Sequence, residues 1–306
     1  MIKRPWKRRE YFYLFFILPA LAFFGVFVIY PFIKNFLITF HSWDGINDMV
    51  FVGLANYKKA LFQSPDFWAP IWHALFLALM GITIQNGLAL LLAWIVDKEI
   101  RGARLYRLIF FIPPMLSFVV IGFLWKWILE PNYGILNIFL HNVGLDKVLL
   151  SVLHLPDATA VPWLGEPKTA LVTVAMVNIW ASFGWGFVMF LAALQGIERD
   201  VYEAARIDGA NNFQEFWKIT FPLLIPIIVT VSILTILGAM QQFDLIYVMT
   251  GGGPAGSTEV PVNQMYMQAF QNGMWGYATT LGVLLGVVLF AISIVQIQIK
   301  KWLVDW

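Results

Sequence analysis

Few residues in this 306-residue sequence have types and spacings that could support covalent chemistry. Gly251, Gly253 and Gly256 match a dinucleotide-binding fingerprint, but Pro254 interrupts it and no strand–helix unit surrounds it. The P-loop pattern G-x-x-x-x-G-K-[ST] is absent, which excludes ATP binding of that kind, and neither H-E-x-x-H nor G-x-S-x-G occurs. The 4 histidines lack metal-ligand spacing and cysteine is absent, so we expect no metal site and no cofactor. The sequence therefore predicts a protein that is not an enzyme.

Several polar and aromatic side chains interrupt long apolar stretches and could bind a small neutral molecule. The candidates are Asn178, Ser182 and Trp185 in one stretch, Ser232, Thr235, Gln241 and Gln242 in a second, and Gln85 and Asn86 in a third. Offsets of three, four and seven residues place most members of the first two groups on one face of a helix. Amides, hydroxyls and aromatic rings suit a sugar, which presents hydroxyl groups and flat apolar faces. The alternative, which the residues leave open, is that these side chains hydrogen-bond neighbouring helices.

The segment 196–221 is polar and carries the signals of a short helix that ends in a sharp turn. Asp200 and the glutamate three residues after it match a capping box, which predicts the first turn of a helix. Gly209 is placed to close that helix in the left-handed conformation, which glycine adopts without steric cost. A second short helix is predicted to follow, capped by Asn211 or Asn212. The alternative interpretation is an amphipathic loop that lies on a membrane surface.

The overall composition is that of an integral membrane protein. Hydrophobic residues make up 60% of the chain and charged residues only 12%, whereas a soluble domain has about 25% charged residues. Too few polar side chains are present to cover a water-exposed surface. The net charge of +2 is too small to indicate a nucleic-acid partner.

Six stretches lack Asp, Glu, Lys and Arg over 18 residues or more, and each is long enough to cross a bilayer as a helix. They cover 11–33, 67–96, 108–125, 169–197, 219–243 and 260–299. None shows the strict alternation of a β-barrel strand. The predicted fold class is therefore an all-α integral membrane protein with six transmembrane helices. The predicted spans are about 11–36, 69–96, 105–127, 169–195, 222–247 and 277–299, within one membrane domain at 11–300.

Lys and Arg are distributed unequally between the two sides of this predicted bundle. Of the 20 Lys and Arg residues, 14 lie in the terminal segments and in the connections after the second and fourth spans, and 6 lie in the other connections. The positive-inside rule places both termini, with the basic segment 1–10 and the tail 301–306, in the cytoplasm. The first apolar stretch continues through Tyr30, beyond the core of a signal peptide, so we expect it to be retained as a span.

The polar segment and the residue after it resemble the EAA loop of binding-protein-dependent ABC importer permeases. That loop has the pattern Glu-Ala-Ala, three residues, Gly, nine residues, Ile-x-Leu-Pro, and this sequence departs from it only at Phe221, where the family has Leu. The resemblance implies that the loop couples a permease to a separate ATPase subunit. The positions to which it assigns this role are Glu203, Ala204, Ala205, Asp208, Gly209, Ile219 and Pro222.

Other segments extend the resemblance over essentially the whole chain. Residues 51–57, 102–113 and 243–254 are similar to the carbohydrate branch of the family, the MalF-, UgpA- and LacF-like permeases. The resemblance implies the MetI-like fold of a type I importer in a bacterial or archaeal cell membrane, with a carbohydrate path along the fourth and fifth spans. It also implies several partners. They are a second permease subunit that forms a heterodimer, two copies of an ABC ATPase subunit that hydrolyses ATP, an extracytoplasmic solute-binding protein, membrane lipid and the carbohydrate itself.

Two other functions are compatible with these observations. An importer of the same family for glycerol-3-phosphate or another polyol derivative would carry the same loop. A stand-alone channel or secondary transporter is the alternative from another class, but secondary transporters usually carry ionisable groups within their spans. Here the chief ones are His73 and Asp244, both near the outer ends of predicted spans. This scarcity favours a neutral substrate.

Overall fold

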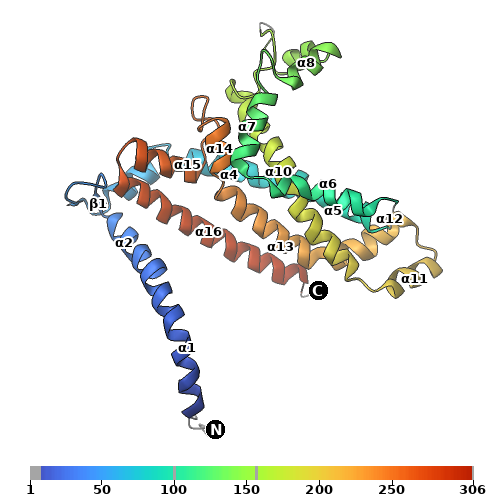
Figure 1. Ribbon diagram of the computed structural model, residues 1–306, viewed down its shortest axis with the longest axis horizontal. Coiled ribbons are helices and arrows are strands. Elements are labelled where there is room, and N and C mark those ends of the chain that lie inside the picture. The colour runs from blue at the N-terminus through green and yellow to red at the C-terminus, as the bar shows by residue number, and fades with distance from the viewer. Residues whose placement is uncertain (1–7, 99–100, 156–157, 305–306) are drawn as a thin grey trace. The chain divides into compact units, whose positions relative to one another are not determined.

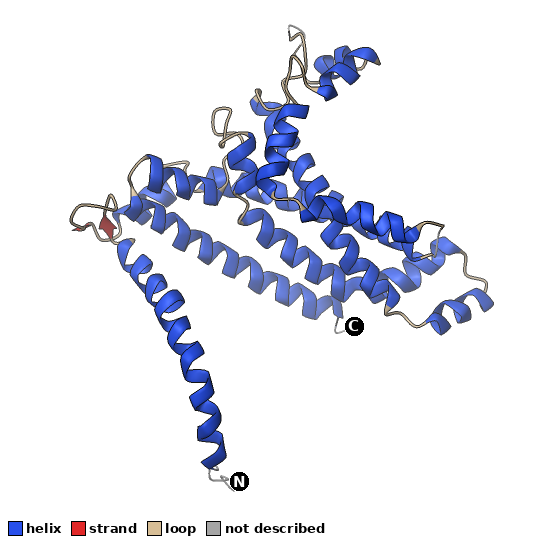
Figure 2. Ribbon diagram, viewed as in Figure 1, coloured by secondary structure: helices blue, strands red, loops and turns tan. Residues whose placement is uncertain are grey.

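The computed structural model describes residues 8–98, 101–155 and 158–304, and this part of the chain is almost entirely helical, as Figure 2 shows. The two strands in it have two residues each, β1 (His41–Ser42) and β2 (Val50–Phe51), and they pair antiparallel. Most of the predicted basic segment 1–10, with Lys3, Arg4 and Lys7, and the end of the predicted tail lie outside the described residues. The chain divides into two compact units, which are described separately below.

The first unit comprises residues 1–64 and 265–284. In it α1 (Arg8–Phe24), a π-helical turn (Gly25–Ile29) and α2 (Tyr30–Ile38) follow one another directly, so that Phe16–Ile38 is long and apolar enough to cross a membrane. The Asn56 amide donates to the backbone oxygens of Thr39 and His41 at 2.9 and 3.0 Å, which ties α3 (Ala55–Lys58) to the end of α2.

The second unit comprises residues 65–264 and 285–306 and holds both candidate sites. Its described helices, all but α9 labelled in Figure 1, are α4 (Trp68–Met80), α5 (Asn86–Asp97), α6 (Ala103–Met115), α7 (Phe118–Ile128), α8 (Ile135–Asn142), α9 (Asp146–Val152), α10 (Pro167–Gln195), α11 (Arg199–Ile207), α12 (Asn212–Glu215), α13 (Phe221–Met240) and α14 (Asp244–Met249). A π-helical turn (Gly81–Gln85) joins α4 to α5, and a second (Phe216–Thr220) joins α12 to α13. Two further helices, α15 (Pro261–Tyr266) and α16 (Trp275–Val304), have residues in both units.

The core of the second unit is built around α10. In the most apolar window of α10 61% of the residues are buried, against 33% for the helix Trp68–Asp97. Phe187 and Phe190 on α10 are almost fully buried, and Leu224 of α13 belongs to the same apolar cluster. Burial of apolar surface contributes about 25 cal/mol per Å² in water, but in a bilayer helices associate through close contact and hydrogen bonds instead. α10 therefore positions the other helices of this unit.

Five helices of the described chain are long and apolar enough to cross a membrane: Phe16–Ile38, Trp68–Asp97, Pro167–Gln195, Asn212–Met240 and Trp275–Ile299. They correspond to five of the six predicted spans. Two bent helix pairs, α6 with α7 and α8 with α9, would raise the number to as many as seven if each pair were one span. The all-helical fold is thus confirmed, and the number six stays a prediction.

The span predicted over about 105–127 consists of two helices with a sharp bend between them. α6 ends at Met115, α7 begins at Phe118, and their axes differ by 96°. The last turn of α6 contains Pro113 and Pro114, which lack the N–H groups that would continue a helix. Ser117 then starts α7 as its N-cap, because its Oγ accepts a hydrogen bond from the N–H of Val119 at 3.3 Å. Proline placement and a serine cap together explain the bend.

The helix of the predicted fifth span differs from the predicted bounds 222–247 at both ends. It begins ten residues earlier, because the π-helical turn carries the backbone from α12 into α13 without a break, and the whole helix is Asn212–Met240. We call Asn212–Met240 the fifth helix. It ends at Met240, and α14 starts separately at Asp244. Pro222 lies in the first turn of α13, two residues after the π-helical turn ends.

Candidate functional site

A cavity of about 430 Å³ lies inside the second unit, between α4, the turn Gly81–Gln85, α10 and α13. Five of the six predicted substrate-path residues line it, together with an amide from the second predicted span: Asn178, Ser182, Trp185, Thr235, Gln242 and Gln85. The remaining described lining residues are apolar or glycine, and none of them is charged. A concave, mostly apolar wall with a few convergent polar groups is typical of a small-molecule site.

Among these described lining residues, Gln242 has an amide nitrogen that is both buried and unsatisfied. Its Nε2 is buried and has no hydrogen-bond partner within the described chain. Buried polar groups are nearly always paired, so an unpaired one that lines a cavity indicates a site for a water or ligand acceptor. The predicted neighbour Gln241 does not line the cavity and is exposed, because it lies on the other side of the helix end. Ser232 does not line the cavity either.

The Thr235 hydroxyl is already engaged by protein groups. Asn86 Nδ2 donates to Thr235 Oγ1 and Thr235 Oγ1 faces Asn86 Oδ1, each at 3.2 Å, and the hydroxyl also lies 2.9 Å from the carbonyl of Val231. Asn86 is only 5% exposed, so this pair joins two helices in the wall of the cavity. Gly81 makes the approach possible, since a Cβ there would lie 2.6 Å from Thr235 Cγ2. At Thr235 the structure therefore supports the interpretation that the polar group bonds a neighbouring helix.

The second candidate site is the polar segment 196–221. It follows α10 and contains α11 and the first turns of the fifth helix. α11 ends as predicted: Gly209 has φ +83°, and the N–H of Ala210 donates back to the carbonyl of Ala205 at 2.9 Å. The capping box predicted at Asp200 is wrong. The N-cap of α11 is Glu198, and no side chain hydrogen-bonds the first N–H groups of this helix. Asp200 lies inside the first turn, where its negative charge interacts favourably with the positive end of the helix dipole.

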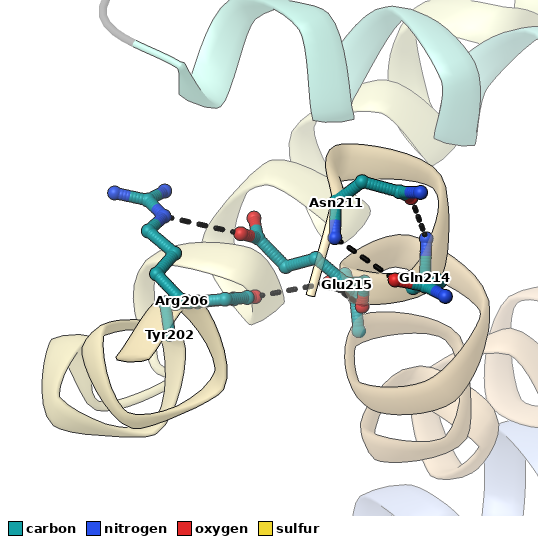
Figure 3. A network of polar contacts seen from close by, with 6 residues as sticks. Tyr202, Arg206, Asn211, Gln214 and Glu215 are labelled. Atoms are coloured by element: carbon teal, nitrogen blue, oxygen red, sulfur yellow. Dashed lines mark hydrogen bonds and ion pairs between the residues drawn. The ribbon is translucent and has the colours of Figure 1, made fainter. Parts of the chain in front are cut away.

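A capping box does occur at the second helix, where only a cap by Asn211 or Asn212 was expected. Asn211 Oδ1 accepts from the N–H of Gln214 at 2.9 Å, and Gln214 Oε1 accepts from the N–H of Asn211 at 3.0 Å (Figure 3). Asn212 is the first residue of the helix rather than its cap. The sequence signal that would have found it is an asparagine followed three residues later by glutamine.

The EAA positions divide between an outward and an inward side of this segment. Ala205 is buried, and the exposed positions are Glu203, Ala204, Asp208, Gly209 and Pro222, while Ile219 is half-buried. Two large apolar residues that the sequence interpretation did not single out are strongly exposed here, Ile207 at 86% and Phe213 at 72%. Exposed apolar side chains next to charged ones are typical of surfaces that contact another protein or a membrane. The signal for Ile207 in the sequence was its position two residues after Ala205, on the opposite side of the helix.

A polar hollow of about 720 Å³ lies beside the inward side of α11. It is lined by Tyr202, Glu203 and Arg206 of α11, by Glu215, and by residues of α5 and α6 that include Trp94 and Arg107. Burial raises the pKa of the Tyr202 phenol above its usual value, so it stays protonated at neutral pH. Lys98 Nζ lies 3.9 Å from the centre of the Trp94 ring, a cation–π contact at the rim.

Known proteins are similar to this chain over nearly its whole length. The sequence profile of a family described as "Binding-protein-dependent transport system inner membrane component" matches residues 85–304. The chain is 30% identical to the trehalose/maltose transport system permease protein MalF of Thermococcus litoralis, over 94% of this chain and 92% of MalF. It is 33% identical to the diacetylchitobiose uptake system permease protein NgcF of Streptomyces coelicolor, over 93% of this chain and 82% of NgcF.

A solved structure has the same fold. It is a chain of a bacterial ABC transporter involved in the import of the acidic polysaccharide alginate, and the TM-score is 0.81 with 97% of each chain covered. The two sequences are 23% identical, so the likeness concerns the fold alone.

Proposed function

The chain belongs to the family of binding-protein-dependent transport system inner membrane components, and from this membership we propose that it is the membrane-spanning permease subunit of an ATP-driven importer for a neutral sugar or oligosaccharide. The relatives MalF and NgcF are named as permeases for trehalose or maltose and for diacetylchitobiose. The observation that carries the proposal is the uncharged cavity of about 430 Å³ lined by Gln242, whose buried amide nitrogen has no hydrogen-bond partner within the described chain. In this proposal the protein is a transport subunit and ATP is hydrolysed by a partner.

The proposed assembly follows the division of labour in the family. This chain forms a heterodimer with a second permease, two copies of an ABC ATPase subunit dock on the cytoplasmic side, and an extracytoplasmic solute-binding protein delivers the sugar. The membrane domain is 11–300, both termini are cytoplasmic, and the loop 196–221 faces the ATPase. The exposed Ile207 and Phe213 beside Glu203 supply the apolar and polar contacts that such docking needs.

The chemistry of the cavity favours a sugar over a phosphate ester. A phosphate needs Arg, Lys or helix N-termini to replace its hydration, whereas the described cavity lining contains no charged side chain. Gln242, Gln85 and Asn178 offer amides for hydroxyl groups, and the ring of Trp185 offers a flat apolar surface. Glycerol-3-phosphate is for this reason the less favoured substrate.

The same absence of charge weighs against a secondary transporter. Proton- or ion-coupled transport uses ionisable groups that bind the coupling ion within the spans, and the described lining of the cavity offers none. Movement of the sugar by alternating access is then driven from outside the subunit, through the loop 196–221.

The proposal is tested by reconstituting the protein in proteoliposomes with the second permease, the ATPase and the binding protein encoded beside it. Uptake of labelled trehalose, maltose and diacetylchitobiose is measured with ATP, without ATP, and with the binding protein omitted. We expect uptake of at least one of these sugars, and only when ATP and all subunits are present. Uptake by the chain alone, or driven by a proton gradient without ATP, would contradict the proposal.

A further inference from the structure

The helix α11 contacts the fifth helix through two side chains that share one face. Tyr202 and Arg206 are four residues apart, which places them one above the other on a helix. Arg206 Nε donates to Glu215 Oε2 at 3.2 Å (Figure 3), and Tyr202 Oη lies 3.3 Å from Thr220 Oγ1. The partner residues Glu215 and Thr220 both belong to the fifth helix, so α11 is held at two points five residues apart along it.

The two residues of the fifth helix in this contact, Glu215 and Thr220, are buried. The side chain of Glu215 is only 6% exposed and Thr220 is 1% exposed, whereas the Arg206 side chain is 64% exposed. The Thr220 hydroxyl also donates to the carbonyl of Glu215 at 3.2 Å. A carboxylate buried without its cation is costly, so the pair opposes separation of the two helices.

The face of α11 that carries Tyr202 and Arg206 also borders the polar hollow. That hollow of about 720 Å³ separates Tyr202 and Arg206 from Trp94 on α5 and Arg107 on α6. Within α11 only Ala205 is buried. Tyr202 and Arg206 therefore contact the fifth helix directly and border the hollow that α5 and α6 also line.

We propose that Arg206 and Glu215, supported by Tyr202 and Thr220, join α11 to the fifth helix as one rigid lever that transmits motion of the loop to the cavity. The fifth helix continues without a break to Met240 and carries Thr235, so a tilt at its cytoplasmic end reaches the cavity wall. The inference rests on the proposed coupling role of the loop. It adds two positioning residues, Arg206 and Glu215, that lie outside the EAA positions.

Charge reversal tests the pair in the assembled transporter. Arg206→Glu and Glu215→Arg should each lower sugar-stimulated ATP hydrolysis about tenfold, the lower end of what a lost hydrogen bond to a charged group costs. The double variant with both reversals should recover most of the lost sugar-stimulated ATP hydrolysis. Lys168→Glu reverses an exposed charge on α10 outside the loop 196–221 and should behave like the parent. The sugar is whichever of trehalose, maltose and diacetylchitobiose the parent takes up. Parental rates of sugar-stimulated ATP hydrolysis in the single variants would contradict the proposed role of the pair. A double variant with a rate no higher than that of either single variant would contradict it too.

A second measurement leaves Arg206 and Glu215 unaltered. It can therefore be made even if the charge-reversed variants fail to assemble. Because the chain has no cysteine, nitroxides can be placed at Asp200→Cys on α11 with Leu223→Cys on α13, and at Asp200→Cys with Leu105→Cys on α6. Distances are measured by pulsed electron paramagnetic resonance in the nucleotide-free complex and with ATP and vanadate. The lever predicts an unchanged first distance and a changed second one.

The remaining outcomes separate the lever from the proposed function. A change in the first distance shows that α11 moves relative to the fifth helix, which overturns the lever and leaves the coupling role intact. No change in either distance shows that α11 does not move when ATP binds. That result overturns the coupling role of the loop, and the lever with it.

Discussion

At the scale of single residues, the two best candidates for sugar contact are not equivalent. Gln242 has an amide nitrogen with no partner in the described chain, whereas the Thr235 hydroxyl is engaged by Asn86 and by the carbonyl of Val231. A ligand can therefore bind Gln242 without displacing a protein hydrogen bond. Binding to Thr235 would require the loss of a contact between helices.

Gln242→Ala should weaken transport while assembly and basal ATP hydrolysis persist. One hydrogen bond to a neutral group contributes about 0.5–1.5 kcal/mol, so we expect the concentration for half-maximal uptake to rise several-fold. Gln241→Ala is the matched control, because Gln241 is exposed and does not line the cavity. Equal uptake kinetics in both variants would remove Gln242 from the site.

Gly209→Val should abolish sugar-stimulated ATP hydrolysis and uptake and leave the protein in the membrane. Gly209 has φ +83° and no neighbouring atom within 4 Å of a built Cβ, so the effect comes from the backbone alone. A left-handed conformation costs a non-glycine residue about 1–2 kcal/mol, and a β-branched residue more. Gly209→Asn is the control, since asparagine tolerates this conformation, and it should retain activity. If the valine variant couples like the parent, the loop is a passive connector.

Glu259 should make stability depend on pH. Burial raises the pKa of its carboxyl group above the usual value of about 4.3, against the opposing effect of the hydrogen bond from Asn263 at 2.7 Å. A raised carboxyl pKa means that the folded state favours the protonated form, so stability falls as pH rises from the unfolded-state value through the folded-state value. In Glu259→Gln the fall in Tm over this range should be smaller than in the parent, and a parallel pH profile would contradict the assignment.

At the scale of elements, glycine placement decides how closely the helices of the second and fifth predicted spans approach. A Cβ at Gly81 would lie 2.6 Å from the Thr235 methyl group, whereas a Cβ at Gly87, in the same helix, would meet nothing within 4 Å. The Asn86–Thr235 hydrogen bonds depend on this close approach. The contact is also part of the cavity wall, since Gly81 and Thr235 both line it.

Gly81→Ala should lower the Tm of the purified protein, because overfilling a close contact costs about 1–3 kcal/mol. Gly87→Ala should leave it unchanged or raise it slightly, since alanine favours helix by about 1 kcal/mol over glycine. Adding Thr235→Ser to Gly81→Ala removes the clashing methyl group, keeps the hydroxyl, and should restore most of the loss. Equal Tm values for Gly81→Ala and Gly87→Ala would show that the two helices can move apart to accommodate the added methyl group without a loss of stability.

At the scale of the whole molecule, membership of the permease family and the all-helical fold are both confirmed, while orientation in the membrane stays a prediction. The predicted orientation rests on the unequal distribution of Lys and Arg between the two sides of the membrane. Single cysteines can test it without background, because the natural chain contains none.

Ile46→Cys should be labelled by a membrane-impermeant maleimide applied to intact cells, and Asn212→Cys should be labelled only after lysis. Ile46 is 91% exposed and lies in the connection after the first span, and Asn212 is an exposed residue of the loop 196–221. Labelling of Asn212→Cys but not Ile46→Cys in intact cells would reverse the orientation.

The sequence by itself determined the class of the protein and the ends of its coupling helix. Apolar stretches free of charge predict helices because an unpaired backbone group in lipid is costly, and this holds whatever the neighbouring helices are. Gly209 predicts a left-handed cap because the cost of a Cβ there is local. The family pattern from Glu203 to Pro222 likewise needs no tertiary information.

Only the tertiary structure decided which polar side chains face a cavity and which are used between helices. Helical spacing placed Ser232, Thr235 and Gln242 together, but a neighbouring helix engages Thr235, Ser232 is outside the cavity, and Gln242 lines it with a free amide nitrogen. The pairing of Arg206 with Glu215 across a turn was equally invisible in the sequence. The physical reason is that the partner of a polar group depends on where another helix lies, and that position is set by close contacts such as Gly81 with Thr235 rather than by spacing along one helix.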